Sequence, residues 1–245
     1  SYSKSLRPGC YTLAIAAADI SDQDLVFKDI FVPQECVKED NDYGIFQPNQ
    51  TGGRMLPRGP GRLLFSTGEW GVHPLAQDPD SLFGKVVEIN LSTGAFEVIS
   101  MGHRNPQGLY DDPASSLLVV AEHGPSGGDE VNINRSPGGK PENYGWPIAS
   151  YGEHYNIDPE VDRQAPLHKS HAEHGFIEPA FSYEISVSPS AVRRMPPDPR
   201  DPDRYALMMG TMGCDYVEGD ESLHIFDLDA EFNVTAQERI ILDDR

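Results

Sequence analysis

The chain has 245 residues, of which 39 are acidic and 19 basic, so its formal net charge is −20. A protein this acidic is not expected to bind nucleic acid or an anionic membrane surface, because both need a basic face. The apolar run at residues 11–20 is far shorter than the roughly 20 residues that a membrane-spanning helix needs, so we expect no membrane span in this chain. The chain begins with Ser1 and stops abruptly at Arg245, and we expect it to be a piece of a longer protein.

Short strand-like runs, separated by glycine, proline or Asx residues, follow one another along the chain. They lie at residues 11–20, 25–32, 62–68, 85–91, 95–101, 116–124, 129–133, 205–213, 222–229 and 238–242. Few windows have the 3.6-residue period of a helix. The sequence therefore predicts an all-β protein.

A loose repeat orders these runs, with units that begin near residues 62, 116 and 204. In each unit an apolar strand ends in small residues, a loop follows, and a strand of alternating character comes next. Such repeats are typical of β-propeller blades, whose loops gather at one mouth of a central channel. A β-sandwich is the alternative, but the long loops fit it less well. The proline-rich, charged segment 195–204 is predicted to be an exposed connector between blades.

The cysteines leave two alternatives open. Cys10 and Cys36 flank a two-strand pattern, so they form a disulfide if the protein is exported, or they are two half-buried thiols. Cys214 would then be unpaired. In the segment 167–176, histidines recur at every third position, but without a supporting carboxylate or cysteine pattern a polar loop is a better interpretation than a transition-metal site.

The segment "AEHGPSGGDEVN" at 121–132 places three glycines, a proline and two adjacent carboxylates directly after a buried strand. Calcium binds six to eight oxygens and combines carbonyls with carboxylates. The carbonyls of Gly124 and Pro125 and the side chains of Asp129 and Glu130 are therefore candidate ligands. Taken alone, however, the segment fits a glycine-rich blade loop better.

Two neighbouring motifs change this interpretation. "GHRNPQGLY" at 102–110 gathers Arg104, Asn105 and Gln107 around one proline, which suits an anionic ligand rich in carbonyls. "NYGWP" follows at 143–147. In this order the three motifs resemble those of the soluble pyrroloquinoline quinone (PQQ)-dependent glucose/sorbosone dehydrogenases, and the aldose sugar dehydrogenase branch is most similar. "TGGRM", "SLFGKVVEINL" and "YEISVSPSAV" extend the likeness to nearly the whole chain.

The resemblance implies a six-bladed β-propeller with PQQ and calcium at the mouth of its channel. It implies an enzyme that oxidises an aldose at its anomeric carbon to the lactone, with a small-molecule sugar and an external electron acceptor as partners, in the periplasm or outside the cell. Parts of the family domain are missing at both ends, so residues 1–245 are expected to be one partial propeller domain. It is expected to cover most but not all of the blades, and a rough strand count gives about four.

The resemblance also implies roles for the cofactor-binding residues. Arg104 and Asn105 contact the quinone oxygens, and Gln107 supports them. The other cofactor contacts implied are His123, Ser186 and, from a late pair of arginines, Arg245.

Calcium ligands follow from the same resemblance. The carbonyls of Gly124 and Pro125 bind the calcium ion that also contacts PQQ. Asp129, Glu130 and Tyr144 belong to a second, structural calcium region.

One position departs from the family pattern. The family's catalytic base is a histidine that opens the motif H-x-G-G-R, whereas this chain has Gln50 there, followed by Thr51, Gly52, Gly53 and Arg54. A neutral amide cannot usefully accept a proton near pH 7. Two hypotheses remain open: an active dehydrogenase that uses another base, with His123 the first to examine, or an impaired propeller that binds PQQ, calcium or carbohydrate without turnover.

Overall fold

The computed structural model describes residues 1–245 except 22–23, 156–164, 214–220 and 243–245. Most of the regular structure in these ranges is β-strand, together with two short 3-10 helices, η1 (His73–Gln77) and η2 (Ala172–His174). The all-β prediction is confirmed. None of the helices in the described ranges has the length and apolar character to cross a bilayer.

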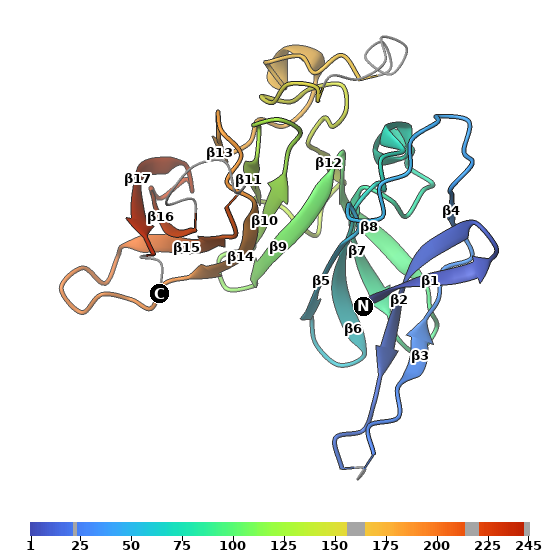
Figure 1. The fold of residues 1–245 in the computed structure, drawn as a ribbon. Coiled ribbons are helices and arrows are strands. Elements are labelled where there is room, and N and C mark those ends of the chain that lie inside the picture. The colour runs from blue at the N-terminus through green and yellow to red at the C-terminus, as the bar shows by residue number, and fades with distance from the viewer. Residues whose placement is uncertain (22–23, 156–164, 214–220, 243–245) are drawn as a thin grey trace.

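The strands form four sheets that stand side by side (Figure 1). The first contains β1 (Tyr2–Arg7), β2 (Cys10–Ala17), β3 (Lys28–Phe31) and β4 (Val37–Lys38). The second contains β5 (Gly52–Pro57), β6 (Arg62–Thr67), β7 (Lys85–Asn90) and β8 (Phe96–Met101), with β12 (Glu142–Asn143) parallel to β8. The third contains β9 (Asn105–Asp112), β10 (Leu117–His123), β11 (Glu130–Asn134) and β13 (Phe181–Ser182). The fourth contains β14 (Pro189–Arg194), β15 (Tyr205–Thr211), β16 (Ser222–Leu228) and β17 (Val234–Ile241).

The core lies between the faces of neighbouring sheets. β10 shows this directly, because its successive side chains point to opposite faces of the sheet. Val119 packs into a cluster with Leu207 of the fourth sheet, and Val120 packs into another with Leu64 of the second. A strand buried on both faces needs a continuous apolar run, and the sequence "SLLVV" supplies it.

The first strands of all four sheets, β1, β5, β9 and β14, were not predicted. β9 lies between β5 and β14. Polar groups link them across the sheets: Arg54 Nε donates to the Gln107 carbonyl (2.8 Å), and Arg193 Nη1 donates to the Leu109 carbonyl (2.8 Å). Because these strands contain glycine, proline and arginine rather than alternating apolar residues, periodicity could not reveal them.

The prediction for segment 195–204 is half wrong. The segment is mostly exposed, as expected, but it joins β14 to β15, which pair with each other in one sheet. It is therefore a connector within a sheet and not between sheets. Proline explains the exposure, because it cannot donate to a sheet ladder.

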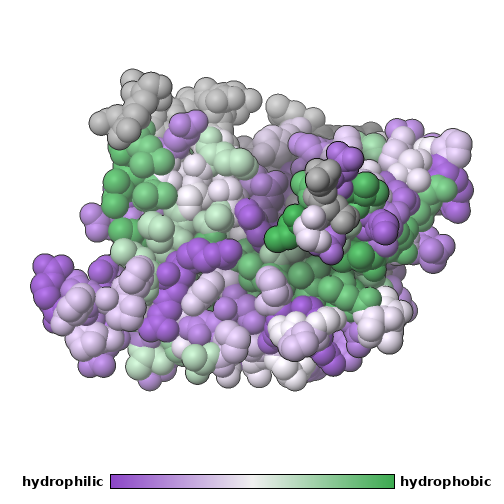
Figure 2. Space-filling model, turned by 90° about the horizontal axis from the view of Figure 1, so that it is seen from below, coloured by the Kyte–Doolittle hydropathy of each residue, from purple (hydrophilic) through white to green (hydrophobic). Residues whose placement is uncertain are grey.

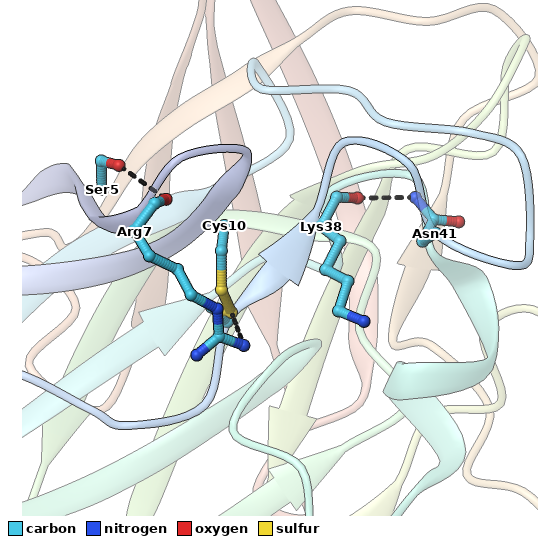
Figure 3. The surroundings of a disulfide bond; sticks show 6 residues. Ser5, Arg7, Cys10, Lys38 and Asn41 are labelled. Carbon is cyan, nitrogen blue, oxygen red and sulfur yellow. Dashed lines mark hydrogen bonds between the residues drawn. A yellow bond between two sulfur atoms is a disulfide. The ribbon is translucent and has the colours of Figure 1, made fainter.

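Cys10 and Cys36 form a disulfide with a Cα–Cα distance of 5.5 Å, and Figure 3 shows its surroundings. The disulfide joins the first residue of β2 to the segment just before β4, near Arg7. Of the two alternatives that the sequence left open, the structure contains the disulfide. Cys214 lies outside the described residues.

Hydrophobic residues reach the surface among hydrophilic ones in the view from below (Figure 2). Ile20, Leu25, Val26 and Phe27, in the connection from β2 to β3, are 92%, 58%, 58% and 66% exposed. An apolar patch of this kind is typical of a surface that packs against another segment or molecule.

We predict that Cys36→Ser lowers the free energy of unfolding by roughly 3 kcal/mol, because the disulfide closes a loop of 26 residues and restricts the unfolded chain. Urea unfolding of the full-length protein, with and without dithiothreitol, measures this. The reductant should destabilise the wild type and leave the variant unchanged. Equal stability of wild type and variant under oxidising conditions would show that the disulfide does not form.

Candidate functional site

A cavity of about 370 Å³ brings together most of the residues that the resemblance implies. Its lining includes Gln50, Arg104, Asn105, His123, Gly124, Asp129 and Ser186. These residues come from the loop before β5, the start of β9, the end of β10 and the loop after β13. Residues more than 130 positions apart in the sequence therefore meet at one place.

The pairing of β9 with β10 sets the floor of the cavity. Asn105 lies opposite His123 in this antiparallel pair. Asn105 also accepts a hydrogen bond from the Gly52 backbone N–H (3.0 Å), which fixes the start of β5 against β9. His123 Nε2 donates to the Pro189 carbonyl (2.9 Å) at the start of β14. Thus three sheets are joined by hydrogen bonds directly at the cavity.

Arg104 is a buried cation, only 7% exposed. Its Nη1 donates to the carbonyls of Gly124 and of His123 (3.3 Å for the latter). The guanidinium also lies 5.4 Å from the ring centre of Trp146. Burial lowers the pKa of Arg104, and the nearby carboxylate of Glu69 opposes this shift. Because arginine keeps its proton in proteins, the side chain places a fixed positive charge beside the cavity.

Gln50 bridges this cation to a buried carboxylate. In the amide orientation that satisfies its neighbours, Nε2 donates to Glu69 Oε1 (2.7 Å), and Oε1 accepts from Arg104 Nη2 (2.8 Å). On the far side, His73 Nδ1 donates to Glu69 Oε2 (3.0 Å). The position of the family's base therefore holds a neutral amide between two opposite charges.

Glu69 and His73 were missed in the sequence. Both are buried, with exposures of 0% and 4%. The available signal was the segment "GEWGVH" at 68–73, which follows the small residues at the end of β6. In the repeat it corresponds to "EHGPSGG", which stands at the end of β10. That equivalence within the repeat could have identified Glu69.

The carboxylate of Asp129 is bonded to the backbone of two loops. Its carboxylate accepts backbone N–H bonds from Gly124 (2.8 Å), Val187 (2.7 Å) and Ser188 (2.8 Å). These bonds hold the loop after β10 against the loop before β14. In this structure Asp129 therefore anchors two loops.

The glycines of this loop are needed for close packing. Gly127 and Gly128 have φ values of +72° and +67°, which side chains rarely adopt. A Cβ atom on Gly128 would lie 2.2 Å from the Gly152 nitrogen. The glycine run therefore lets the loop turn tightly beside the main cavity, which Gly124 lines.

The carbonyls of Gly124 and Pro125 fit a calcium ion as part of a ligand set. The Gly124 carbonyl accepts from Arg104, and the Pro125 carbonyl accepts from Ser186 Oγ (3.2 Å). Each carbonyl oxygen has a second lone pair that a hard cation can use. A cation here would lie beside the Arg104 guanidinium, so an anionic ligand that contacts both would offset the repulsion between them.

The side chains of Tyr144 and Glu130, implied for the second calcium region, contact polar neighbours. Tyr144 donates its hydroxyl to Glu142 (2.7 Å), and Glu130 accepts from Asn132 Nδ2 (3.2 Å). Burial raises the pKa of Glu130 well above its usual range, and the neighbouring Glu122 adds to this shift. Across the described ranges, no group of three or more His, Cys, Asp and Glu side chains is arranged to hold a metal ion.

Two predicted cofactor residues are not among those that line the main cavity. Gln107 lines a separate cavity of about 290 Å³, together with Gly52 and Arg54. Arg245 lies outside the described residues. The structure therefore places Arg104, Asn105, His123 and Ser186 at the main cavity and does not place Gln107 there.

The chain belongs to the glucose/sorbosone dehydrogenase family. The family model described as Glucose / Sorbosone dehydrogenase matches residues 1–245. Aldose sugar dehydrogenase YliI of Escherichia coli (strain K12) is 41% identical over 121 residues, which are 44% of this chain and 32% of that protein. Quinoprotein glucose dehydrogenase B of Acinetobacter calcoaceticus is 36% identical over 87 residues, which are 31% of this chain and 17% of that protein.

A solved structure shares the fold over nearly the whole chain. The soluble aldose sugar dehydrogenase from Escherichia coli, in its apo-form, superposes with a TM-score of 0.72 and 27% identity. This match covers 98% of this chain and 67% of that one, whereas the matched segments span a third or less of the two curated relatives.

We predict that Asp129→Asn lowers the free energy of unfolding by about 1–3 kcal/mol, because the amide NH₂ would face backbone N–H donors that then lack an acceptor. Urea unfolding measures the change. Asp229→Asn is the matched control, because Asp229 also accepts backbone N–H bonds, from Glu231 and Asn233, but is only partly buried and these bonds are exposed. A control as destabilised as Asp129→Asn would contradict the anchoring role.

Proposed function

We propose that the protein containing this chain is a PQQ- and calcium-dependent dehydrogenase that oxidises an aldose at its anomeric carbon to the lactone. The observation that carries this proposal is the single cavity in which Arg104, Asn105, His123 and Ser186 meet the carbonyl-rich loop after β10. Family membership supports it, as do relatives named aldose sugar dehydrogenase and quinoprotein glucose dehydrogenase.

The proposal extends to the fold and the location. We infer a closed six-bladed propeller, of which the four described sheets form part. The disulfide between Cys10 and Cys36 supports a periplasmic or secreted protein, because such bonds persist in oxidising compartments. An external electron acceptor would be the second partner, since the reduced cofactor has to be reoxidised.

The residues present fit PQQ, which is a flat, anionic quinone. Arg104 offers a buried, pre-positioned cation, and charge-assisted hydrogen bonds of this kind are stronger than neutral ones. Asn105 would contact the quinone oxygens, and Gly124 and Pro125 would hold calcium through their carbonyls. When bound, PQQ supplies the hydride acceptor, and calcium offsets the charge that develops on the quinone oxygen.

The reaction also needs a proton acceptor, and the family's base position holds Gln50 in this chain. The sugar hydroxyl has to lose its proton as the hydride departs. Gln50 cannot accept it, because its amide is neutral and is held between Arg104 and Glu69. This observation favours the alternative function, a propeller that binds PQQ, calcium or carbohydrate with impaired turnover.

His123 is the first candidate for a replacement base. It lines the cavity, and its Nε2 carries the hydrogen that is donated to Pro189, so neutral His123 has its lone pair on Nδ1. Burial lowers the pKa of His123, which favours this neutral form. In the described part of the chain, no hydrogen bond engages Nδ1.

We predict that the full-length protein binds PQQ in the presence of calcium and that Arg104→Ala weakens this binding by roughly 10- to 100-fold, the range expected for a lost charge-assisted contact. Titration of PQQ, followed by its absorbance, measures both affinities. Arg54→Ala is the control, because Arg54 lies outside the main cavity. Equal affinity of Arg104→Ala and wild type would remove Arg104 from the site.

We predict that wild-type aldose oxidation is slow and that Gln50→His raises it by roughly 10²- to 10⁴-fold, the usual value of general-base assistance. Glu69 would accept a hydrogen bond from the new imidazole and hold it in place. Histidine becomes a base when it loses its proton, so the rate should rise with pH through a pKa of about 6.5. Dye-linked assays on a panel of aldoses across pH measure this.

Gln47→His is the matched control. Gln47 lines the same cavity, so this variant also places an imidazole there. The Glu69 carboxylate, which would orient the imidazole, contacts position 50. It should not gain activity. A fast wild type whose rate is unchanged by Gln50→Ala would mean that another residue takes the proton. If wild type and Gln50→His both bind PQQ and neither oxidises a sugar, the impaired-turnover function is supported.

A further inference from the structure

Glu122 is a buried carboxylate that the proposed chemistry does not use. It lies near the end of β10 and is 3% exposed. Its Oε2 accepts a hydrogen bond from the backbone N–H of Arg104 (2.7 Å). Its Oε1 accepts from His103 Nδ1 (2.7 Å) and from Asn132 Nδ2 (2.8 Å). One carboxylate therefore serves three N–H donors, which only a group without hydrogens of its own can do.

The local sequence creates the need for this carboxylate. Glu122 pairs with Pro106 of β9, and the register of the two strands shifts between Ala121 and Glu122. Proline has no N–H to donate, so the ladder is incomplete at this point. Arg104 immediately precedes β9, and its N–H is bonded to the side chain of Glu122 instead of to a strand. A buried N–H without an acceptor would be costly.

The partners of Glu122 are themselves fixed. The His103 ring accepts at Nε2 from Ser100 Oγ (2.7 Å) and lies 5.2 Å from the ring of Tyr144. His103, Ser100 and Asn132 are all 0% exposed. These groups come from β8, β11 and the segment between β8 and β9, so Glu122 ties its own strand to several others in the floor below the cavity.

The other end of Arg104 reaches the cavity. Its guanidinium contacts the Gly124 carbonyl and Gln50, which both line the cavity. An arginine side chain is long and flexible, so the direction of its guanidinium depends on where its backbone is held. Glu122 accepts its hydrogen bond from the backbone end of Arg104. Glu122 does not line the main cavity, although it lines a small cavity with Arg104 and His123.

We propose that Glu122 is a positioning residue for Arg104: it fixes the Arg104 backbone so that the guanidinium meets the anionic ligand in the cavity. This inference rests on the proposed binding of PQQ. It predicts that loss of the carboxylate weakens PQQ binding although Glu122 does not contact PQQ, and that this effect disappears when Arg104 is absent.

A double-mutant cycle tests the proposal on the full-length protein with calcium present. Glu122→Gln leaves one oxygen for three donors, and the affinity for PQQ should fall by about 10- to 100-fold. In an Arg104→Ala background the same change should alter the affinity by less than about threefold, because the interaction passes through Arg104. Glu35→Gln is the matched control, since Glu35 also accepts a backbone N–H, from Leu82 (2.7 Å), in another part of the fold. If Glu122→Gln does not fold, Glu122→Asp replaces it, because its shorter side chain cannot reach both Arg104 and His103.

Hydrogen exchange of the PQQ-free protein separates this proposal from the proposed function. Exchange in the peptide that contains Arg104 should be faster in Glu122→Gln than in wild type, with the peptides of the first sheet unchanged. If the wild type binds no PQQ, the proposed cofactor is wrong. Faster exchange at Arg104 in Glu122→Gln than in wild type would then still support the anchoring of Arg104. Equal PQQ affinity in wild type and Glu122→Gln, an equal loss with and without Arg104, or unchanged exchange at Arg104 would overturn the proposal.

Discussion

The buried guanidinium of Arg104 is the constraint on which this end of the molecule depends. A buried cation is costly unless acceptors surround it. Here the acceptors are the carbonyl of Gly124 and the amide oxygen of Gln50, and the face of Trp146 lies over the guanidinium. These groups belong to loops at the ends of different sheets, so the loops have to converge on Arg104.

This constraint explains the glycine-rich segment after β10. The loop must bring the carbonyl of Gly124 against Arg104, and Asp129 holds it there through the backbone of Gly124, Val187 and Ser188. The same constraint links the two proposed ligands. Calcium at the carbonyls of Gly124 and Pro125 would lie beside a fixed positive charge, so it binds well only when an anion is also present. An anionic quinone would meet that need.

The sequence predicted the strands whose residues alternate or are continuously apolar. It indicated residues of the main cavity because they fall in multi-residue motifs. Other features left no signal of these kinds. β9 contains Pro106, and it is bonded to β5 through the Asn105 side chain and the Gln107 backbone carbonyl. Glu122 is a single carboxylate inside an apolar strand, and no period marks it. A carboxylate after a glycine turn has the same sequence signal whether it binds metal or accepts backbone N–H groups, so the backbone bonds of Asp129 could be identified only from the structure.

Calorimetric titration of calcium into the full-length protein, with and without PQQ, tests this account most directly. If Arg104 repels the ion until an anion offsets its charge, calcium affinity must be much higher with PQQ, and by reciprocity PQQ affinity must rise by the same factor with calcium. In Arg104→Ala, calcium should bind more tightly than in wild type when PQQ is absent. Equal calcium affinity with and without PQQ, unaffected by Arg104→Ala, would contradict the account.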